Sequence, residues 1–559
     1  MPQTTLRGLR VSDALLLFAF ALALRLAHIL AMRQSPFFDH PLVDAFTFHQ
    51  AAKSIASGDG HPDKIFWQPP GYPYFLGLIY WAVGGVNFLA PRVAQAVLGA
   101  FAAVATAWIG ARQLGHGVGL AAGITVALYG TLIYFDGELL GVSLTVALQL
   151  GAVSLALLAS SAERSRLLWF AAGAVAGIAS LVTATSLVFV AIFSVFARRL
   201  ALWCLIGAML AIAPATIRNL VKGGELIPIS SNGGVNLYIG NNPRYDEVVA
   251  VRPDIRWKDL TAEPVRHGIS SKAGASNYFV GKVTEWARHD PLAFLRLQLR
   301  KVRLLLGGDE IFRNQTIYPA RAYSPVLSAM LWKVPGVAFP FGILAPLSLL
   351  GLAVAWKRAP LLAWIVAIYA LANVAFFITA RYRVPMVPYL AIFAALGVRW
   401  FLVEAKRGAR AVAMVGVAGV YALSNLGAGP MPTRMNADAE LTLGGFLHLE
   451  GRLDEARQHY LLSIEERGDD PEPWADLGAL ETDSRRPDSA ERAFQEALRI
   501  KPEYAGALLG LGALRESEGR PEEAIVFYKR ASLTDPNDTW PRARILELSR
   551  RLGIRAGSP

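Results

Sequence analysis

The stretch GVGLAAGITVALYGTLIYFDGELLGVSLTVALQLGAVSLALLA (residues 117–159) contains two apolar runs separated by a short acidic turn. A helix needs roughly 20 apolar residues to cross the hydrocarbon core of a bilayer. We therefore expect two membrane-spanning helices, at 117–135 and 139–159, joined at this turn. The turn carries Asp136 and Glu138, and charged groups at membrane level are costly and usually serve a function. The stretch predicts a membrane protein with chemistry at one membrane face.

The same apolar pattern recurs along most of the chain. Of its 559 residues 54% are hydrophobic and 18% charged, and the mean hydropathy is +0.37. We predict an all-α, polytopic transmembrane helix bundle of about eleven spans. The other nine are expected at 11–32, 92–112, 166–181, 183–198, 199–218, 334–355, 360–379, 384–403 and 409–427. Residues 71–89 hold Pro73 and several aromatic residues, so we expect a helix along the membrane interface there.

The basic residues indicate which side of the membrane each loop faces. The formal net charge is +12, and its clusters lie in short loops between apolar runs. Because cytoplasmic loops carry the excess of Lys and Arg, the N-terminus is predicted to lie inside. The loops 33–91 and 219–333 then lie outside, as does everything after residue 427. With this explanation of the charge we expect no nucleic acid partner. We expect the membrane to be a bacterial inner (plasma) membrane.

The C-terminal part shows an internal repeat. Gly444, Gly478 and Gly512 are 34 residues apart, which is the period of tetratricopeptide (TPR) helix pairs. The alanines Ala456, Ala490 and Ala524 and the aromatic residues Tyr460, Phe494 and Tyr528 follow the same spacing. We predict three repeats over 437–538, forming an extracytoplasmic α-solenoid, and a capping helix and tail over 539–559. A concave surface of this kind usually binds a peptide or protein partner, and a spacer or a dimerisation surface is the alternative.

Residues 1–427 resemble a known family of enzymes. The segments that carry the resemblance are LVDAFTFHQAAKSIASGDG (42–60), WQPPGYPYFLGLIYWAVG (67–84), YFDGELL (134–140), SNGGVNLYIGNNP (231–243) and ARYRVPMVPYL (380–390). Their order and spacing are similar to those of the GT-C membrane glycosyltransferases, in particular the branch of protein O-mannosyltransferases and the lipid A aminoarabinose transferase. The resemblance implies transfer of a sugar from a polyprenyl phosphate to a hydroxyl or amine of a protein, lipid or glycan on the outer side.

The implied reaction suggests roles for three residues. A hydroxyl acceptor is a weak nucleophile, so a positioned carboxylate has to take its proton, and Asp44 is the candidate catalytic base. Arg381 and Arg383 are candidates to bind the donor phosphate. Since Pro385 disfavours helix for the residue before it, we expect this segment to be extended, with both guanidinium groups on one side. The alternative for Asp44 is a helix cap.

Further residues are candidates with equally ordinary alternatives. Asp136 and Glu138 are expected to form a second acidic site, for the acceptor or a metal, unless they cap the following span. His49 could ligate a metal, although loop histidines are more often solvated. Lys301 and Arg303 could meet the donor phosphate, while contact with membrane lipid headgroups is favoured. The need for a divalent metal or another cofactor is left open.

Two other classes of function are considered. Charges inside a membrane also suit a transporter or flippase of lipid-linked sugars, which would be expected to show paired inverted repeats. The chain could also be a membrane-anchored TPR scaffold. That alternative leaves the placement of Asp44 and the two arginines of ARYRVP unexplained.

Overall fold

The computed structural model describes residues 5–6, 8–161, 165–249, 255–312, 316–426, 429, 437–534 and 540–553. The chain divides into two compact units, Met1–Thr433 and Arg434–Pro559. Among the described residues the strands form two short antiparallel pairs, and the rest of the regular structure is helical. The pairs are β1 (Thr5–Leu6) with β2 (Leu9–Arg10) and β3 (Trp332–Val334) with β4 (Val337–Phe339). The predicted all-α architecture is confirmed.

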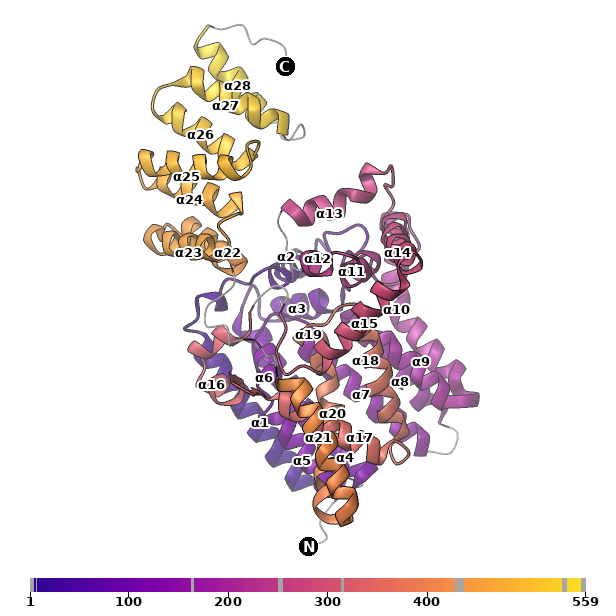
Figure 1. Cartoon of the computed structure of the whole chain (residues 1–559). Coiled ribbons are helices and arrows are strands. Elements are labelled where there is room, and N and C mark those ends of the chain that lie inside the picture. Colours follow the sequence, from indigo (N-terminus) through magenta and orange to yellow (C-terminus); the bar gives the residue numbers. More distant parts are fainter. Residues whose placement is uncertain are drawn as a thin grey trace. The chain divides into compact units, whose positions relative to one another are not determined.

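The first unit is a bundle of apolar helices (Figure 1). Five described helices are long and apolar enough to cross a membrane, or six if one bent pair forms a single span. The five are α1 (Val11–Met32), α4 (Leu89–Leu114), α7 (Val142–Ser161), Ala184–Gly223 and Ala380–Glu404. The bent pair is α5 (His116–Ala127) and α6 (Gly130–Asp136), which meet at 56°. Three shorter apolar helices are α8 (Arg166–Val182), α17 (Phe341–Ala355) and α18 (Pro360–Ala375).

Two of these stretches consist of several helical segments. Ala184–Gly223 contains η2 (Ala184–Ser186), α9 (Leu187–Ala197), η3 (Arg198–Leu200) and α10 (Ala201–Gly223). Ala380–Glu404 contains α19 (Ala380–Arg383), η5 (Val384–Met386), α20 (Val387–Arg399) and the π-helical η6 (Trp400–Glu404). The helix α21 (Arg407–Asn425) lies where the last span is expected. The segments predicted as spans are therefore largely helical. The main exceptions are the start of 334–355, the end of 360–379, where α18 stops at Ala375, and the start of 139–159, where α7 begins at Val142.

The span expected at 334–355 begins later than predicted. Residues 332–339 form the β3–β4 hairpin, and α17 starts only at Phe341. Gly336 takes a φ of 80° in the tight turn, a conformation that glycine adopts without steric cost. The rings of Trp332 and Phe339 stack 5.1 Å apart across the hairpin. The apolar residues of this segment were thus mistaken for the first turn of a helix.

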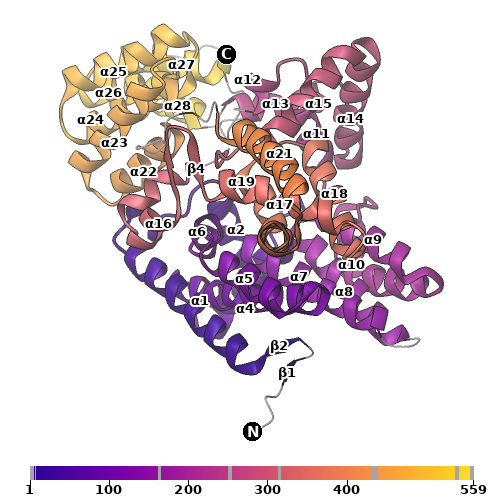
Figure 2. The same ribbon diagram turned by 60° about the horizontal axis from the view of Figure 1, so that its bottom comes forward.

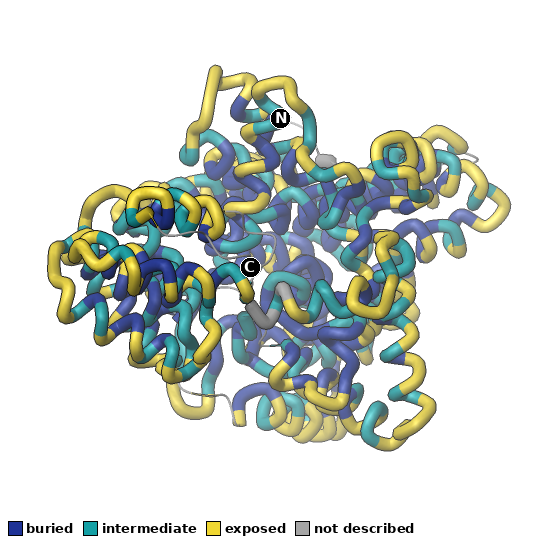
Figure 3. Tube along the Cα trace, turned by 90° about the horizontal axis from the view of Figure 1, so that it is seen from above, coloured by how far each residue is buried: buried dark blue, intermediate teal, exposed yellow. Residues whose placement is uncertain are grey.

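Small residues allow the helices of the bundle to approach closely. A Cβ atom on Gly173 of α8 would overlap the carbonyl of Cys204 on α10, and one on Gly351 of α17 would overlap the carbonyl of Phe393 on α20. Such positions bring helix backbones together in membranes, where van der Waals contact replaces the hydrophobic effect. Buried residues gather where the helices meet, and exposed ones follow their outer turns (Figure 3). The core of the bundle is therefore tightly packed.

Shorter helices gather at one end of the bundle (Figure 1). They are α2 (Asp44–Ala56), α3 (Gly71–Ala82), α11 (Gly233–Gly240), α12 (Tyr245–Val249), α13 (Ile255–Arg266), α14 (Lys272–His289) and α15 (Pro291–Leu306). The same unit contains η1 (Pro36–Phe38), η4 (Tyr318–Ala322) and α16 (Pro325–Met330), which contacts α1 and α6. The predicted interface helix corresponds to α3, which packs against α2. Tyr72 and Tyr80 of α3 are buried and Trp81 is 69% exposed, so α3 presents one face to the protein.

The second unit is a stack of helix pairs (Figure 2). The pairs are α22 (Ala437–Leu449) with α23 (Leu453–Glu466), α24 (Pro471–Asp483) with α25 (Pro487–Ile500), and α26 (Ala505–Ser517) with α27 (Pro521–Thr534), followed by α28 (Trp540–Arg551). Gly478 faces the ring of Phe494 and Gly512 the ring of Tyr528, so the glycines of the repeat make room for its aromatic residues. Residues 535–539 and 554–559, at the predicted end of the third repeat and in the tail, lie outside the described residues.

Candidate active site

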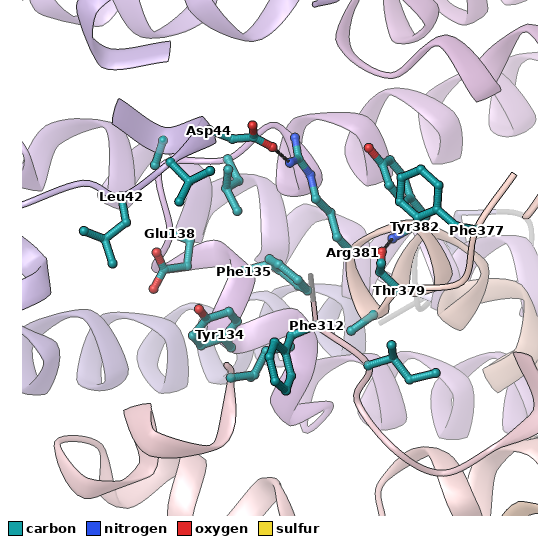
Figure 4. Close-up of a pocket in the computed structure, with 16 residues that line it drawn as sticks. Leu42, Asp44, Tyr134, Phe135, Glu138, Phe312, Phe377, Thr379, Arg381 and Tyr382 are labelled. Carbon is teal, nitrogen blue, oxygen red and sulfur yellow. Dashed lines mark hydrogen bonds and ion pairs between the residues drawn. The ribbon is translucent and has the colours of Figure 1, made fainter. Parts of the chain in front are cut away.

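A largely apolar cavity lies in the first unit beside α2 and α19. It brings together segments from distant parts of the sequence, and Figure 4 shows the side chains that surround it. The lining residues are Leu42, Val43, Asp44, Ala45, Tyr134, Phe135, Glu138, Leu140, Ile311, Phe312, Ile317, Phe377, Thr379, Ala380, Arg381 and Tyr382. Three of the sequence-predicted site residues, Asp44, Glu138 and Arg381, are therefore gathered at one cavity.

Asp44 is the first residue of α2, and its two carboxylate oxygens have different partners. The Arg381 guanidinium donates to Oδ2 at 2.5 Å, and the Gln68 amide donates to Oδ1 at 3.0 Å. The side chains of Asp44 and Arg381 remain 22% and 24% exposed. The preceding residue, Val43, has a φ of 49°, which is strained for a β-branched residue. Backbone strain of this kind is concentrated at functional sites, where it aims a side chain.

The segment Arg381-Tyr382-Arg383 is helical, so the prediction of an extended segment is wrong. The Thr379 side chain accepts from the Tyr382 N–H at 3.4 Å, and α19 begins at Ala380. Pro385 does not prevent this, because Val384 adopts a helical conformation and Pro385 itself sits in η5. Residues two apart on a helix point in different directions. The two guanidinium groups consequently face different parts of the protein.

Arg383 lies away from the cavity and is 1% exposed. It donates to the carbonyls of Gly307 and Asp309, at 2.5 and 2.8 Å, and to the Glu310 carboxylate at 3.0 Å. Its guanidinium also lies 3.7 Å from the centre of the Phe341 ring. The neighbouring Ile311 carbonyl accepts from the backbone N–H of Ala380 at 2.7 Å. Arg383 thus fixes the loop against which α19, and with it Arg381, is positioned.

Glu138 lines the other side of the cavity, across Phe135 from Arg381 in Figure 4. Burial raises the pKa of this carboxyl above its usual range, while the nearby Arg92 guanidinium and the Tyr134 hydroxyl oppose the shift. Gln95 holds the turn by donating to the backbone carbonyls of Asp136 and Glu138, at 3.0 and 2.6 Å. Gln95 therefore fixes the backbone of Glu138, and the Glu138 carboxyl loses its proton at a higher pH than an exposed glutamate does.

Asp136 does not line this cavity. Its carboxylate accepts from Arg25 Nε at 2.7 Å, and the two side chains are 2% and 0% exposed. Arg25 also donates to the carbonyls of Ala21, Ala127 and Val126. The last two end α5 at the bend before α6, where helix carbonyls lack intrahelical partners. The pair thus connects α1 to the bent helix, and the expected second acidic site is divided between the cavity and the bundle interior.

The remaining candidates lie outside this cavity. His49 is buried, with its Nδ1 atom 3.0 Å from the Tyr80 hydroxyl, and burial and then Lys53 lower its pKa. Lys301 is fully buried and donates to the carbonyls of Gly240 and Phe376 and to Asn241 Oδ1 at 2.8–3.0 Å. Burial lowers the pKa of Lys301 to about 7, whereas three acceptors match the three donors of the ammonium form. Arg303 is exposed. Within the part of the chain that is described, no three His, Cys, Asp or Glu residues come together as metal ligands.

Several residues of the site were missed by the sequence analysis. Gln68 is the second residue of WQPPGYP (67–73), part of a segment that carries the family resemblance, and could have been identified from that motif. Glu310 ends the run LLLGGDE, a charged pair after an apolar helix. Arg92 donates to the Gly137 carbonyl at 2.7 Å and was counted simply as the start of a span. None of these pairings has a local sequence signal, since each joins elements far apart in the chain.

The repeat unit matches a known family. The model of the tetratricopeptide repeat matches residues 482–546. Superkiller protein 3 of Schizosaccharomyces pombe is 36% identical over 77 residues, which is 14% of this chain and 6% of that protein. The solved first TPR domain of Spaghetti, in complex with an HSP90 peptide, is 21% identical over 21% of this chain and 93% of its own, with a TM-score of 0.20.

Two solved membrane enzymes are similar over most of the chain. The oligosaccharyltransferase AglB from Archaeoglobus fulgidus, solved with an inhibitory peptide and a dolichol phosphate, is 13% identical, with a TM-score of 0.43. The match covers 79% of this chain and 59% of AglB, so this chain spans about three fifths of that protein. ArnT from Cupriavidus metallidurans, bound to undecaprenyl phosphate, is 14% identical over 92% of this chain and 79% of its own, with a TM-score of 0.38. Both belong to the class of membrane glycosyltransferases that the sequence motifs resemble.

Proposed function

We propose that this chain is an integral membrane glycosyltransferase that moves a sugar from a polyprenyl phosphate to an acceptor hydroxyl or amine at the extracytoplasmic face. The observation that carries the proposal is the Asp44–Arg381 ion pair at a cavity lined mainly by apolar side chains. Such a cavity suits the first isoprene units of a lipid, and a guanidinium beside it suits the phosphate that the lipid carries. A carboxylate at the same point suits proton transfer.

The roles of the two residues follow from the balance of the reaction. The acceptor O–H gives its proton to Asp44, and its oxygen bonds to the anomeric carbon of the sugar. The bond from that carbon to the phosphate oxygen breaks, and its electron pair stays on the phosphate. Arg381 stabilises this growing charge. Since the donor phosphate competes with Asp44 for the same guanidinium, donor binding frees the carboxylate to act as a base.

The test of the proposal is the variant Asp44→Asn, which keeps the shape of the side chain and removes the proton acceptor. We expect transfer to fall by about 10²-fold or more, with melting temperature and binding of undecaprenyl phosphate kept. Asp59→Asn is the matched control, because Asp59 is exposed in the same loop region. Wild-type transfer by the Asp44→Asn variant would remove Asp44 as the base and leave Glu138 as the next candidate.

The extracytoplasmic position of the repeats is part of the same proposal. The native Cys204 is buried, so it gives little background in thiol labelling. In a Cys204→Ser background, a Ser532→Cys variant is expected to react with an impermeant maleimide in cells with a permeable outer membrane and an intact inner membrane. Labelling only after the inner membrane is lysed would place the repeats in the cytoplasm and reverse the proposed topology.

The alternative of a lipid-sugar transporter has one observation in its favour, the bend between α5 and α6. Transporters use broken helices in pairs related by an inverted repeat. Within the described residues a single bent pair is found, and Arg25 bonds its carbonyls to α1. A catalytic role accounts for the polar groups at the cavity, whereas the bend has a structural explanation. The transferase is therefore the function we propose.

A further inference from the structure

Two further cavities lie along the segment 61–68 of the first unit. The first lies between α2 and this segment, and the second lies between the segment, α13 and α14. Trp67 lines both, so they adjoin one another. We call the two together the Trp67 groove.

The wall of the Trp67 groove is held in place by buried groups. Arg218 donates to the carbonyls of His61 and Asp63, at 2.9 and 2.7 Å, and its guanidinium lies 4.3 Å from the centre of the Phe66 ring. Asn219, which is fully buried, accepts from the Phe66 N–H at 3.0 Å. The Trp67 carbonyl accepts from the backbone N–H of Asn232 at 3.2 Å. The position of Trp67 is thus fixed before any ligand arrives, which reduces the entropy lost on binding.

The Trp67 groove reaches Asp44 through Gln68. Gln68 lines the first cavity and donates its amide to Asp44 Oδ1, while Arg381 binds the opposite oxygen Oδ2. The other amide atom, Gln68 Oε1, is buried and has no hydrogen-bond partner in the described structure. An unpaired buried carbonyl of this kind is destabilising until a hydrogen-bond donor reaches it. One oxygen of the Asp44 carboxylate therefore faces Arg381, where the sugar donor is proposed to bind. The other faces Gln68 and the Trp67 groove.

The side chains of the Trp67 groove combine flat aromatic surface with neutral hydrogen-bonding groups. Trp67 and Trp257 meet edge to face with ring centres 6.4 Å apart. The polar lining includes Thr47, Gln50, Ser231, Thr261, Ser270 and Ser276. Hydroxyl and amide groups both donate and accept hydrogen bonds. A sugar ring presents an apolar C–H face and a rim of hydroxyls, and so it fits an indole face bordered by such groups.

We propose that the Trp67 groove binds a neutral glycan, whose terminal hydroxyl passes Gln68 to reach Asp44 as the acceptor. The inference rests on the proposed function and names its acceptor class. On arrival, the acceptor hydroxyl replaces the Gln68 amide on Asp44 Oδ1 and gives that oxygen its proton. The freed Gln68 amide and its Oε1 atom are then available to other hydroxyls of the same sugar. Gln68 acts as a positioning residue.

Other ligand classes fit the Trp67 groove less well. A peptide that binds by adding a strand needs an exposed sheet edge. The described walls of the groove are helices, the segment 61–68 and the loop residues Ser231 and 269–271, and they include no strand. An anionic polymer needs several cations. The described lining contains one lysine, Lys272, which lies 5.9 Å from the centre of the Trp67 ring. The negative charge of Asp63, which also lines the groove, balances its positive charge. The lining is therefore closest to that of a neutral carbohydrate site.

Binding is tested first, without any donor. Purified full-length protein in detergent is applied to an array of neutral and anionic oligosaccharides, with decaproline as a peptide probe. We expect neutral glycans to be retained, and Trp67→Ala and Gln50→Ala to weaken binding by about tenfold or more. Gln50 is exposed, so its variant tests the groove without disturbing the core. Trp81→Ala, at an exposed tryptophan outside the groove, is the control. Binding of anionic glycans or decaproline alone, or of no glycan, would overturn the inference.

Transfer to a bound glycan is tested second. With a neutral glycan from the array as acceptor, Gln68→Ala is expected to raise the acceptor KM about tenfold or more and to leave donor KM and undecaprenyl phosphate binding unchanged. An unchanged acceptor KM contradicts the positioning role. The failures are distinguishable, because glycan binding is measured without transfer. Full transfer by Asp44→Asn would contradict the proposed function alone, whereas loss of transfer in Asp44→Asn with an array that retains no glycan would contradict the groove alone.

Discussion

Two of the arginine–carboxylate pairs in the described part of the bundle have the same chemistry and opposite character. Arg381 and Asp44 meet at the cavity with side chains 24% and 22% exposed, and Asp44 keeps a second, replaceable contact to Gln68. Arg25 and Asp136 meet in the interior with almost no exposure, and the other N–H groups of Arg25 donate to backbone carbonyls. The first pair can exchange its partners for a ligand, whereas the second can only be broken. A pair with partly exposed side chains and a replaceable hydrogen bond can bind a ligand, whereas a buried pair whose donors are all satisfied has a structural role. Residue type alone does not distinguish the two.

Removing one partner of the interior pair is expected to have the largest effect on folding. Asp136→Ala leaves the Arg25 charge buried without its counter-ion, which costs about 3–5 kcal/mol. The variant should be recovered in low yield or melt well below the wild type, as followed by thermal unfolding in detergent. The double variant Arg25→Met with Asp136→Leu removes both charges and should recover much of the loss. Wild-type stability of Asp136→Ala would make Asp136 a free acid and reopen it as a site residue.

A smaller loss is expected from crowding the same pair. Gly99 of α4 lies so close that an added Cβ would overlap the Asp136 carboxylate and the Arg25 guanidinium. Gly99→Ala should therefore destabilise by about 1–3 kcal/mol. Gly151→Ala on α7 is the matched control, because its Cβ would meet only Val175, at 3.9 Å. The control should be neutral or stabilising, since alanine is the better helix former. Equal melting temperatures for the two variants would contradict the close packing at Gly99.

The two arginines of ARYRVP should separate catalysis from stability. Arg381→Lys keeps the charge and loses the planar fork, so the donor KM should rise about tenfold while the melting temperature is kept. Arg383→Lys loses bonds to the loop at 307–310 and should lower the melting temperature. Donor KM and melting temperature are measured for both variants, with Arg303→Lys as an exposed control. A raised donor KM in Arg303→Lys would return Arg303 to the phosphate site.

The smallest effect is expected from Glu138 and concerns pH. Because burial raises the pKa of this carboxyl in the folded state, the unfolded chain ionises first as pH rises. Glu138 should therefore lower stability as pH rises from its ordinary pKa through the raised value. Glu138→Gln cannot ionise, so its melting temperature should fall less than that of the wild type as the pH rises above the ordinary Glu pKa of about 4.3. Glu285→Gln, at an exposed position of α14, should follow the wild type. Parallel curves for all three proteins would show that Glu138 is freely solvated.

Much of the fold could be predicted because its signals are local. Apolar length located the spans, and the 34-residue period located the repeats. The β3–β4 hairpin was missed because its apolar residues continue the composition of the following helix, although the Pro335-Gly336 dipeptide marks the turn. The helical form of Arg381-Tyr382-Arg383 was missed because the Thr379 cap outweighs the preference that Pro385 imposes.

The site was predictable as a set of residues but not as a set of pairs. Asp44 and Arg381 are 337 positions apart, and nothing in either motif indicates that they meet. The neighbouring Asp136 and Glu138 were taken together, yet α6 ends between them and sends one inward and the other to the cavity. Arg383 was assigned to the phosphate on its spacing from Arg381, whereas Glu310 and two carbonyls occupy it. Pairings of this kind depend on packing, which sequence spacing does not encode.

The Arg25–Asp136 pair also bears on how the protein is made. Arg25 lies in the first span, and its partner is synthesised 111 residues later. During that interval the insertion machinery has to accept a helix with an uncompensated cation, at a cost of about 2.5–3.5 kcal/mol. The helix α1 remains strongly apolar, with a mean hydropathy of 2.2 that already includes Arg25, and this offsets the cost. We expect α1 to remain near the translocon, with lateral release into lipid delayed until α5 and α6 arrive, so that the order of synthesis becomes the order of assembly.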